Sequence, residues 1–273
     1  MPATPFTDPD LVAGPLYATS GRLAQRTGAL HAAKISGDDA TTTIVNLAAR
    51  LVPDAAVVCD IGCGRGTTTV HLAQRLAPKR LIAVDQSPAL LATVADRMAD
   101  AGLAVETVRA DFHHLPLAEA SVDIAVAAFC LYHSTHPENV MAEIARCLTP
   151  GGRAVVATKS ADSYHEIDQL IADAGLAPQA TSQPSLYESF HSANAAQIAA
   201  TSLQVGHVVH QQHVFRFSGL DHLAEYLATS PKYRLPGHLV GEAGALADEL
   251  RRRLPDHPVT TTSTVTYVTA ACP

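Results

Sequence analysis

Two hydrophobic periods alternate along the chain. Short runs rich in apolar and β-branched residues predict strands at 55–60, 81–85, 104–111, 122–129 and 153–158. Around them, apolar residues recur at helical spacing, which predicts helices at 38–54, 67–77, 88–101 and 137–148. Strands that alternate with helices predict a parallel sheet covered on both faces, with right-handed crossovers. The first 160 residues therefore indicate a doubly wound α/β fold.

Local signals support the helix boundaries. Ser87 precedes a helical pattern as its predicted N-cap, and Pro88 occupies the first helical position. Asp or Thr residues can cap the helix at 38–54, and Pro53 stops it.

The pattern after residue 160 is less regular. It predicts helices near 163–174, 189–203, 219–229 and 240–253, and strands at 207–217 and 260–271. These two closing strands would extend the sheet to seven strands. We expect the helices between them to cover the cleft.

Composition narrows the functions open to the chain. Its 273 residues are 47% hydrophobic and 16% charged, with a net charge of −7. That charge argues against a nucleic-acid partner, because such affinity depends on neutralising phosphates. No run approaches the roughly 18 apolar residues of a membrane span. Prolines and acids stand where a signal peptide needs a basic start and an apolar core, which predicts a cytoplasmic protein.

The number and spacing of the cysteines predict neither a metal site nor a disulfide framework. Five cysteines, an odd number without paired metal-type spacing, predict reduced and mostly packed thiols. The composition leaves open whether the chain forms a homodimer.

The stretch "VVCDIGCGRGTTTVHLA", residues 57–73, places glycines at 62, 64 and 66 between a strand and a helix. Glycine has no Cβ, so a ligand can lie almost on the main chain. A dinucleotide site needs G-x-G-x-x-G, and Thr67 stands at the third glycine position. Asp60 would also repel a pyrophosphate. The loop therefore predicts a phosphate-free nucleoside with a positive end.

Other informative residues also follow predicted strands. Asp85 ends the second strand, Asp111 and Phe112 end the third, and "FCLYHSTH" follows the fourth. Open α/β sheets bind ligands beyond the carboxyl ends of their strands, where the strand order reverses. We expect these residues to meet at one edge of the sheet.

Five motifs carry a family resemblance: "DIGCGRG", "VDQSP", "RADFHHLPL", "VDIAVAAFCLYH" and "LTPGGR". In order and spacing, over residues 40–160, they resemble class I S-adenosylmethionine-dependent methyltransferases, in the small-molecule branch related to ubiquinone and menaquinone biosynthesis enzymes. The resemblance implies a Rossmann-like, mostly parallel seven-stranded sheet with a helical cover. It also implies a lid that contacts substrate at 1–37 and a methyltransferase domain at 38–273, with cover elements around 160–206 and 219–254.

The resemblance implies S-adenosylmethionine as cofactor and assigns its contacts. Asp60 would face the cationic amino end, Asp85 would accept hydrogen bonds from both ribose hydroxyls, and Asp111 would accept one from the adenine amino group. Phe112 would pack on the adenine ring, although ordinary core packing is the competing interpretation. The implied cofactor-binding residues are Asp60, Gly62, Cys63, Gly64, Asp85, Gln86, Asp111, Phe112 and Phe129.

Methyl transfer from a sulfonium needs aligned reactants more than a catalytic triad, an effect worth up to ~7–11 kcal/mol. A base matters for a hydroxyl, ammonium or acidic-carbon acceptor. Tyr132 and His133 follow the strand whose end would point at the methyl group, so one of them is the candidate base or orienting group. Tyr17 lies in "GPLYATSGRL", which resembles the lid of related enzymes. Purely structural roles for His133 and Tyr17 remain alternatives.

Two other kinds of site fit the sequence less well. In "HVVHQQH", His210 faces away from His207 and His213, which stand about 20 Å apart on a strand, so no metal is predicted. Arsenite methyltransferases, another branch with similar motifs, need cysteines in the acceptor site, whereas the cysteines of this chain fall largely in predicted strands, the glycine loop and a helix of the cofactor half.

The sequence predicts methyl transfer to an N, O or C nucleophile of a small organic acceptor, and secondary metabolism is one setting that it leaves open. The alternatives are a cyclisation assisted by the same cofactor, or a non-catalytic scaffold subunit.

Overall fold

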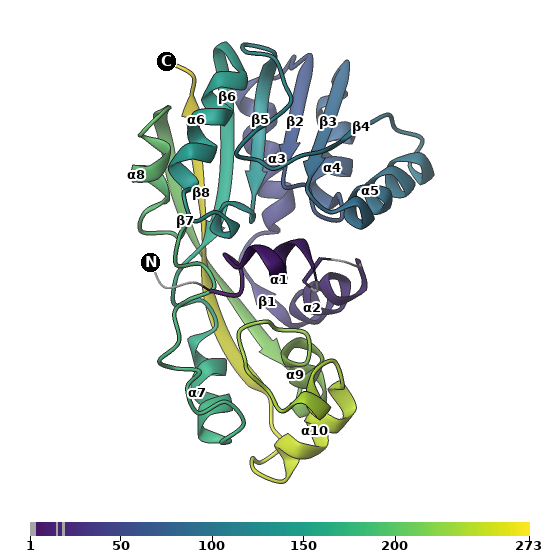
Figure 1. Cartoon of the computed structure of the whole chain (residues 1–273), viewed down its shortest axis with the longest axis vertical. Helices are drawn as coiled ribbons and strands as arrows, with labels where there is room; N and C mark the ends of the chain where they lie inside the picture. The colour runs from purple at the N-terminus through teal and green to yellow at the C-terminus, as the bar shows by residue number, and fades with distance from the viewer. Residues whose placement is uncertain (1–3, 15, 18–19) are drawn as a thin grey trace.

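The computed structural model describes residues 4–14, 16–17 and 20–273 (Figure 1). Residues 1–3, 15, 18 and 19, all in the predicted lid, lie outside the described residues. The strands are β1 Lys34–Ser36, β2 Val57–Ile61, β3 Arg80–Asp85, β4 Glu106–Arg109, β5 Val122–Ala128, β6 Leu148–Lys159, β7 Gln204–Phe217 and β8 Val259–Ala271. The helices are α1 Pro9–Ala13, α2 Ser20–Ala33, α3 Ala40–Leu51, α4 Thr67–Leu76, α5 Pro88–Asp100, α6 Pro137–Cys147, α7 His165–Asp173, α8 Ala195–Ala199, α9 Leu220–Leu227 and α10 Ala243–Arg251, with short 3₁₀ turns at Leu131–His133 and Gly237–Leu239.

The strands form one sheet in the order β1-β7-β8-β6-β5-β2-β3-β4. Strands β6, β5, β2, β3 and β4 are parallel, as the alternating pattern predicts. The strand order reverses at β2, which pairs with β3 on one side and β5 on the other. Ligands of doubly wound sheets bind at such a reversal.

The sheet has eight strands, so the predicted number of seven is wrong by one. Strands β8 and β7 close the sheet antiparallel, as two late strands were expected to do. The additional strand is β1, which pairs antiparallel with β7 through Lys34 opposite Phe215 and Ser36 opposite Val214. Three residues are too few to show a strand period, so only the tertiary pairing reveals β1.

Helices cover both faces of the sheet. On one face, Ile144 of α6 and Ala195 of α8 join a core with Ile61 and Val156. On the other, helices α3, α4 and α5 contribute Ile44, Leu72 and Val94 to a second core with the strands. A parallel sheet buried on both faces explains why its strands read as nearly continuous apolar runs.

The predicted caps are confirmed, and one predicted helix is too long. Ser87 caps α5 by accepting the Leu90 N–H, and Asp39 caps α3 by accepting the Thr42 N–H. The helix expected at 189–203 is confined to Ala195–Ala199. Its first part turns instead, because the Asn194 side chain accepts the His191 N–H and the Ser189 hydroxyl donates to the Tyr132 carbonyl.

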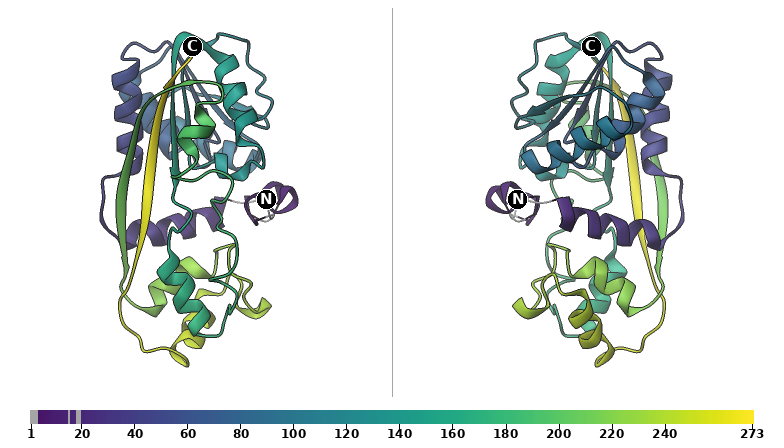
Figure 2. Two further views of the ribbon diagram at one scale, coloured as in Figure 1. Left: turned by 90° about the vertical axis from the view of Figure 1, so that its left-hand side faces the viewer. Right: turned by 90° about the vertical axis from the view of Figure 1, so that its right-hand side faces the viewer.

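Strands β7 and β8 continue beyond the parallel strands into a helical cluster (Figure 1). Helices α7, α9 and α10 build this cluster around a third core that includes Phe217, Leu223 and Leu250. Figure 2 shows α2 lying across the molecule between the sheet and the cluster. None of the helices in the described part of the chain is long and apolar enough to cross a membrane.

Candidate cofactor and acceptor site

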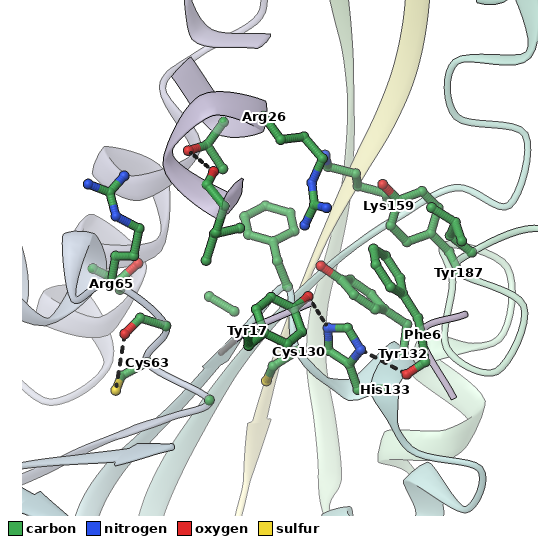
Figure 3. A pocket seen from close by; sticks show the side chains of 18 of the residues that line it. Phe6, Tyr17, Arg26, Cys63, Arg65, Cys130, Tyr132, His133, Lys159 and Tyr187 are labelled. Carbon is green, nitrogen blue, oxygen red and sulfur yellow. Dashed lines mark hydrogen bonds between the residues drawn. The ribbon is translucent and has the colours of Figure 1, made fainter. Parts of the chain in front are cut away.

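A cavity of about 560 Å³ lies where the carboxyl ends of β2, β3 and β5 face α2 and the helical cluster (Figure 3). Of the predicted cofactor residues, all but Asp60 line it: Gly62, Cys63, Gly64, Asp85, Gln86, Asp111, Phe112 and Phe129. The three candidate catalytic residues, Tyr17, Tyr132 and His133, line it as well. The fold therefore brings together residues from separate motifs.

The glycine loop enters the cavity through backbone conformations that favour glycine. Gly62 has φ +64° and Gly64 has φ +56°. A Cβ on Gly62 would lie 2.5 Å from the Cys130 Cβ, whereas a Cβ on Gly64 would meet nothing within 4 Å. Gly62 thus allows β2 and the β5 end to pack closely, and Gly64 leaves open space for a ligand against the main chain.

This difference predicts unequal effects of two matched substitutions. We expect Gly62→Ala to lower the free energy of unfolding by about 2–5 kcal/mol, because it adds a clash with Cys130 to backbone strain. Gly64→Ala is the control, since it adds the strain alone and should cost about 1–2 kcal/mol. Equal losses in urea denaturation of the two ligand-free variants would contradict the packing role of Gly62.

Asp85 ties the end of β3 to the glycine loop. Its Oδ2 accepts the Gly64 N–H at 2.9 Å and its Oδ1 accepts the Ser87 N–H at 2.9 Å. Burial raises the pKa of Asp85, and these backbone hydrogen bonds limit the rise. Each carboxylate oxygen keeps a lone pair for a further donor, which is what two ribose hydroxyls would need.

Asp60 lies behind the loop and is not one of the residues lining the cavity. It is 1% exposed, and one carboxylate oxygen accepts the Thr69 hydroxyl at 2.6 Å. Burial raises its pKa to about 7. The direct hydrogen-bond partner of Asp60 is therefore Thr69 of α4, and its predicted role toward the amino end of a ligand stays a prediction.

The raised pKa gives Asp60 a measurable effect on stability. A carboxyl with a folded-state pKa near 7 and an unfolded value of 3.8 stabilises the fold at low pH, and that stability is lost as pH rises toward 7. We expect Asp60→Asn, which keeps an oxygen for Thr69, to be increasingly more stable than the wild type between pH 5 and pH 8. The gain should be on the order of 2–3 kcal/mol by chemical denaturation. A difference in stability between Asp60→Asn and the wild type that does not change with pH would show that Asp60 is ionised over the whole range.

Asp111 is oriented by a histidine that the sequence analysis did not single out. Asp111 Oδ1 accepts the His113 backbone N–H at 2.9 Å and lies 2.7 Å from His113 Nδ1. Although partial burial opposes it, these contacts lower the pKa of Asp111. His113 Nε2 lies 2.8 Å from the Ser134 hydroxyl, so the ring bridges the ends of β4 and β5. The only signal in the sequence was a histidine two residues after Asp111 in "DFHH".

The cysteines beside the loop are protonated thiols. Burial raises the pKa of Cys63 and of Cys130 well above the ordinary thiol value. The Cys130 thiol donates to the Ile61 carbonyl at 3.3 Å, which joins the ends of β5 and β2. All five cysteines are free, as predicted.

Tyr17 and His133 form a hydrogen-bonded pair inside the cavity (Figure 3). His133 Nδ1 lies 2.9 Å from the Phe6 carbonyl, which can only accept, so Nδ1 carries the proton. His133 Nε2 therefore accepts the Tyr17 hydroxyl proton across 2.9 Å. Burial lowers the pKa of His133 to about 4, so the ring is neutral at physiological pH.

Tyr132 serves a different part of the cavity wall. Its ring stacks on Phe6 at a centroid distance of 5.3 Å and meets Tyr187 edge-on at 5.0 Å. Burial raises its pKa well above the ordinary phenol value. The Tyr132 ring is therefore held by packing against other aromatic rings, whereas Tyr17 and His133 are held together by a hydrogen bond.

Further lining residues come from segments that no motif marked. Phe6 and Arg26 belong to the N-terminal segment, and Lys159 ends β6. Tyr164, Leu186 and Tyr187 follow β6.

The histidine-rich strand β7 makes ordinary contacts. His210 lies 2.7 Å from the Thr266 hydroxyl, and His213 lies 3.1 Å from the Gln211 side-chain oxygen. Among the described residues, no group of three or more His, Cys, Asp or Glu side chains could hold a metal ion.

Comparisons with known proteins agree with this geometry. Residues 59–156 match the sequence family described as "Methyltransferase domain". A ubiquinone/menaquinone biosynthesis C-methyltransferase of Ralstonia pickettii is 32% identical over 100 residues, which is 36% of this chain and 41% of that protein. The chain thus spans less than half the length of this curated relative.

Solved structures share the fold over a longer region. A protein of Bacillus halodurans with the methyltransferase fold superposes with a TM-score of 0.61 at 15% identity, covering 86% of this chain and 99% of that one. The geranyl diphosphate C-methyltransferase of Streptomyces coelicolor, solved with Mg²⁺, geranyl diphosphate and S-adenosyl-L-homocysteine, superposes with a TM-score of 0.52 at 15% identity. It covers 85% of this chain and 79% of that one. The resemblance and the Rossmann-like methyltransferase fold predicted from the motifs are confirmed.

Proposed function

We propose that this chain, whose residues 59–156 match the family described as "Methyltransferase domain", is an S-adenosylmethionine-dependent methyltransferase acting on a small organic molecule. One observation carries the proposal: the glycine loop and Asp85 meet at one cavity, joined by the Gly64 hydrogen bond, at the point where the strand order reverses. The same cavity extends beyond them to the aromatic side chains of Phe6, Tyr132 and Tyr187, where an acceptor has room.

The residues at the sheet edge fit the cofactor. The open space at Gly64 admits a ligand against the backbone, and Asp85 offers two acceptor oxygens to ribose hydroxyls. Asp111 would accept from the adenine amino group, with Phe112 beside the ring. Cys63, Gln86 and Phe129 would complete the wall. At the sheet edge, the carboxylates of Asp85 and Asp111 suit a cationic ligand better than a pyrophosphate.

When bound, S-adenosylmethionine supplies an electrophilic methyl carbon, whose bond to sulfur breaks with the electron pair as the acceptor atom bonds to it. Residues of the chain itself accept the proton that the acceptor loses. An acceptor hydroxyl that donates to the Tyr17 oxygen can lose its proton to Tyr17 while the Tyr17 proton passes to His133 Nε2. The neutral His133 is ready to receive it, because Nδ1 is held protonated by Phe6.

The full chain provides the test. Calorimetric titration with S-adenosylhomocysteine should show binding, and active preparations should release S-adenosylhomocysteine in proportion to methylated product. Turnover without S-adenosylhomocysteine would favour the cyclisation alternative. A flat titration with a folded protein would leave a scaffold subunit as the better interpretation.

Three points raised by the sequence stay untested: whether the chain forms a homodimer, the predicted absence of a nucleic-acid partner and the predicted cytoplasmic location. Sedimentation at several concentrations would test the first of them.

A further inference from the structure

Two cationic side chains reach into the acceptor part of the cavity from different elements. Arg26 comes from α2 and Lys159 from the end of β6 (Figure 3). Both side chains are partly buried. A cation taken from water is costly unless an opposite charge or strong hydrogen bonds replace the lost hydration.

Neither cation has an anionic partner in the described part of the chain. The Arg26 guanidinium donates to the Thr229 carbonyl at 3.3 Å, and Lys159 Nζ donates to the Tyr164 hydroxyl at 2.6 Å. None of the ion pairs between described residues includes Arg26 or Lys159. Arg26 also hydrogen-bonds the Tyr17 side chain. A guanidinium has five N–H donors in a planar fork, so Arg26 keeps further donors for a ligand.

The carboxylates that line the cavity are engaged elsewhere. Asp39 accepts the Thr42 N–H at the start of α3, and Asp85 accepts the Gly64 and Ser87 N–H groups. Asp111 is held by His113. No carboxylate of the described residues forms an ion pair with Arg26 or Lys159, so no direct contact neutralises their positive charge in the acceptor part of the cavity.

Aromatic rings surround the two cations. Arg26 lies 5.8 Å from the centre of the Phe6 ring, and Lys159 lies 4.9 Å from the Tyr164 ring and 5.7 Å from the Tyr187 ring. Burial raises the pKa of Tyr17 and of Tyr187, and the positive charge of Arg26 opposes the rise at both. Flat apolar walls beside paired cations suit a planar ligand that carries an anionic group.

We propose that the methyl acceptor carries a carboxylate, which binds Arg26 and Lys159, on a planar apolar body packed among Phe6, Tyr132 and Tyr187. This inference rests on the proposed function and adds the acceptor class. The planar fork of Arg26 matches the two oxygens of a carboxylate. A diphosphate would bring more negative charge than two cations offset, and the described residues provide no cluster that could hold a metal ion beside it. The carboxylate anchors the molecule, and a second group receives the methyl.

Binding probes test the class without knowledge of the natural acceptor. Hydroxybenzoate and hydroxycinnamate isomers, their methyl esters and the matching aryl phosphates are titrated into the full chain saturated with S-adenosylhomocysteine. We expect at least one carboxylate to bind about 10-fold or more tightly than its ester, since a charged hydrogen-bond pair is lost in the ester. Equal binding of every acid and ester, or no binding of any acid, would overturn the proposal. Preferential binding of an aryl phosphate would overturn the assignment to a carboxylate.

Variants identify the anchor. Arg26→Met and Lys159→Met should each weaken the carboxylate about 10- to 100-fold and leave its ester unaffected. Arg26→Lys should recover only part of the affinity, because the fork is lost. Arg75→Met, at an exposed position on α4, is the control for loss of one positive charge and should change neither affinity. Thermal unfolding of each variant shows that the fold is retained.

The cofactor also contains a carboxylate, so its affinity is measured in the same variants. Unchanged S-adenosylhomocysteine affinity in Arg26→Met is expected. A loss of S-adenosylhomocysteine affinity equal to the loss for the probe would assign Arg26 to the cofactor and overturn the proposal. Wild-type protein that binds no S-adenosylhomocysteine would instead reject the proposed function itself. If a bound acid turns over, an alkali-labile methyl ester as product would contradict the anchoring role.

Discussion

Replacing His133 with phenylalanine lowers kcat by about 100- to 10,000-fold for an acceptor that must lose a proton, which is the range of general-base help. The loss is expected because His133 Nε2 is the proton acceptor for the Tyr17 hydroxyl, at 2.9 Å. Affinity for S-adenosylhomocysteine should stay within about threefold of wild type, since a base that acts on the acceptor contributes to the transition state rather than to cofactor binding.

Two further variants separate catalysis from structure. Tyr17→Phe removes the hydroxyl but keeps the His133 contact with the Phe6 carbonyl. It should lower kcat about as much as His133→Phe, and the double variant should be scarcely slower than either single one, because residues that act as a unit are not additive. His136→Phe, at an exposed position three residues away, is the matched control. A Tyr17→Phe enzyme with normal kcat would reduce His133 to an anchor for the N-terminal segment.

The rate should also depend on pH in a way set by His133. Only the neutral ring accepts a proton, and burial lowers its pKa to about 4. As pH falls, kcat/KM should hold through pH 6 and decline only near the shifted pKa. An ordinary histidine would cause the decline near pH 6.5. A decline at that higher pH, absent in Tyr17→Phe, would contradict the buried neutral state of His133.

Asp85→Ala is expected to weaken S-adenosylmethionine binding by about 1–3 kcal/mol, or about 5- to 150-fold, as loss of a charged hydrogen-bond partner does. Two effects combine: the ribose loses its acceptors, and the glycine loop loses the carboxylate that accepts the Gly64 N–H. Asp85→Asn keeps one acceptor oxygen and should show a smaller loss. Calorimetry with both variants measures these affinities.

Asp100→Ala, at an exposed position near the end of α5, is the control for loss of a carboxylate. Denaturation of the ligand-free variants measures how much of the Asp85 effect comes from the loop. If Asp85→Ala is folded and binds the cofactor as tightly as wild type, the ribose lies elsewhere and the site assignment fails.

Short-range features of this protein were predictable from its sequence. Ser87 with Pro88 marks the start of α5, and the apolar strand runs mark the parallel sheet. The glycine loop follows β2 and the acid Asp85 ends β3, so their meeting at the strand reversal follows from the rule for parallel sheets. Each of these depends on dihedral preferences and periodicity within about a dozen residues, which the chain carries locally.

Tertiary structure alone decided the acceptor side. Tyr17 meets His133 across 116 residues of sequence, and Arg26 and Lys159 enter one cavity from an N-terminal helix and the end of β6. The short strand β1 has no period of its own, and its pairing with β7 completes the sheet. These contacts depend on how α2 and the helical cluster pack against the sheet edge, and no local pattern in the chain encodes that packing. The sequence by itself determined the cofactor edge, because backbone geometry places it. The folded chain determined which side chains face the acceptor, because only long-range packing brings them together.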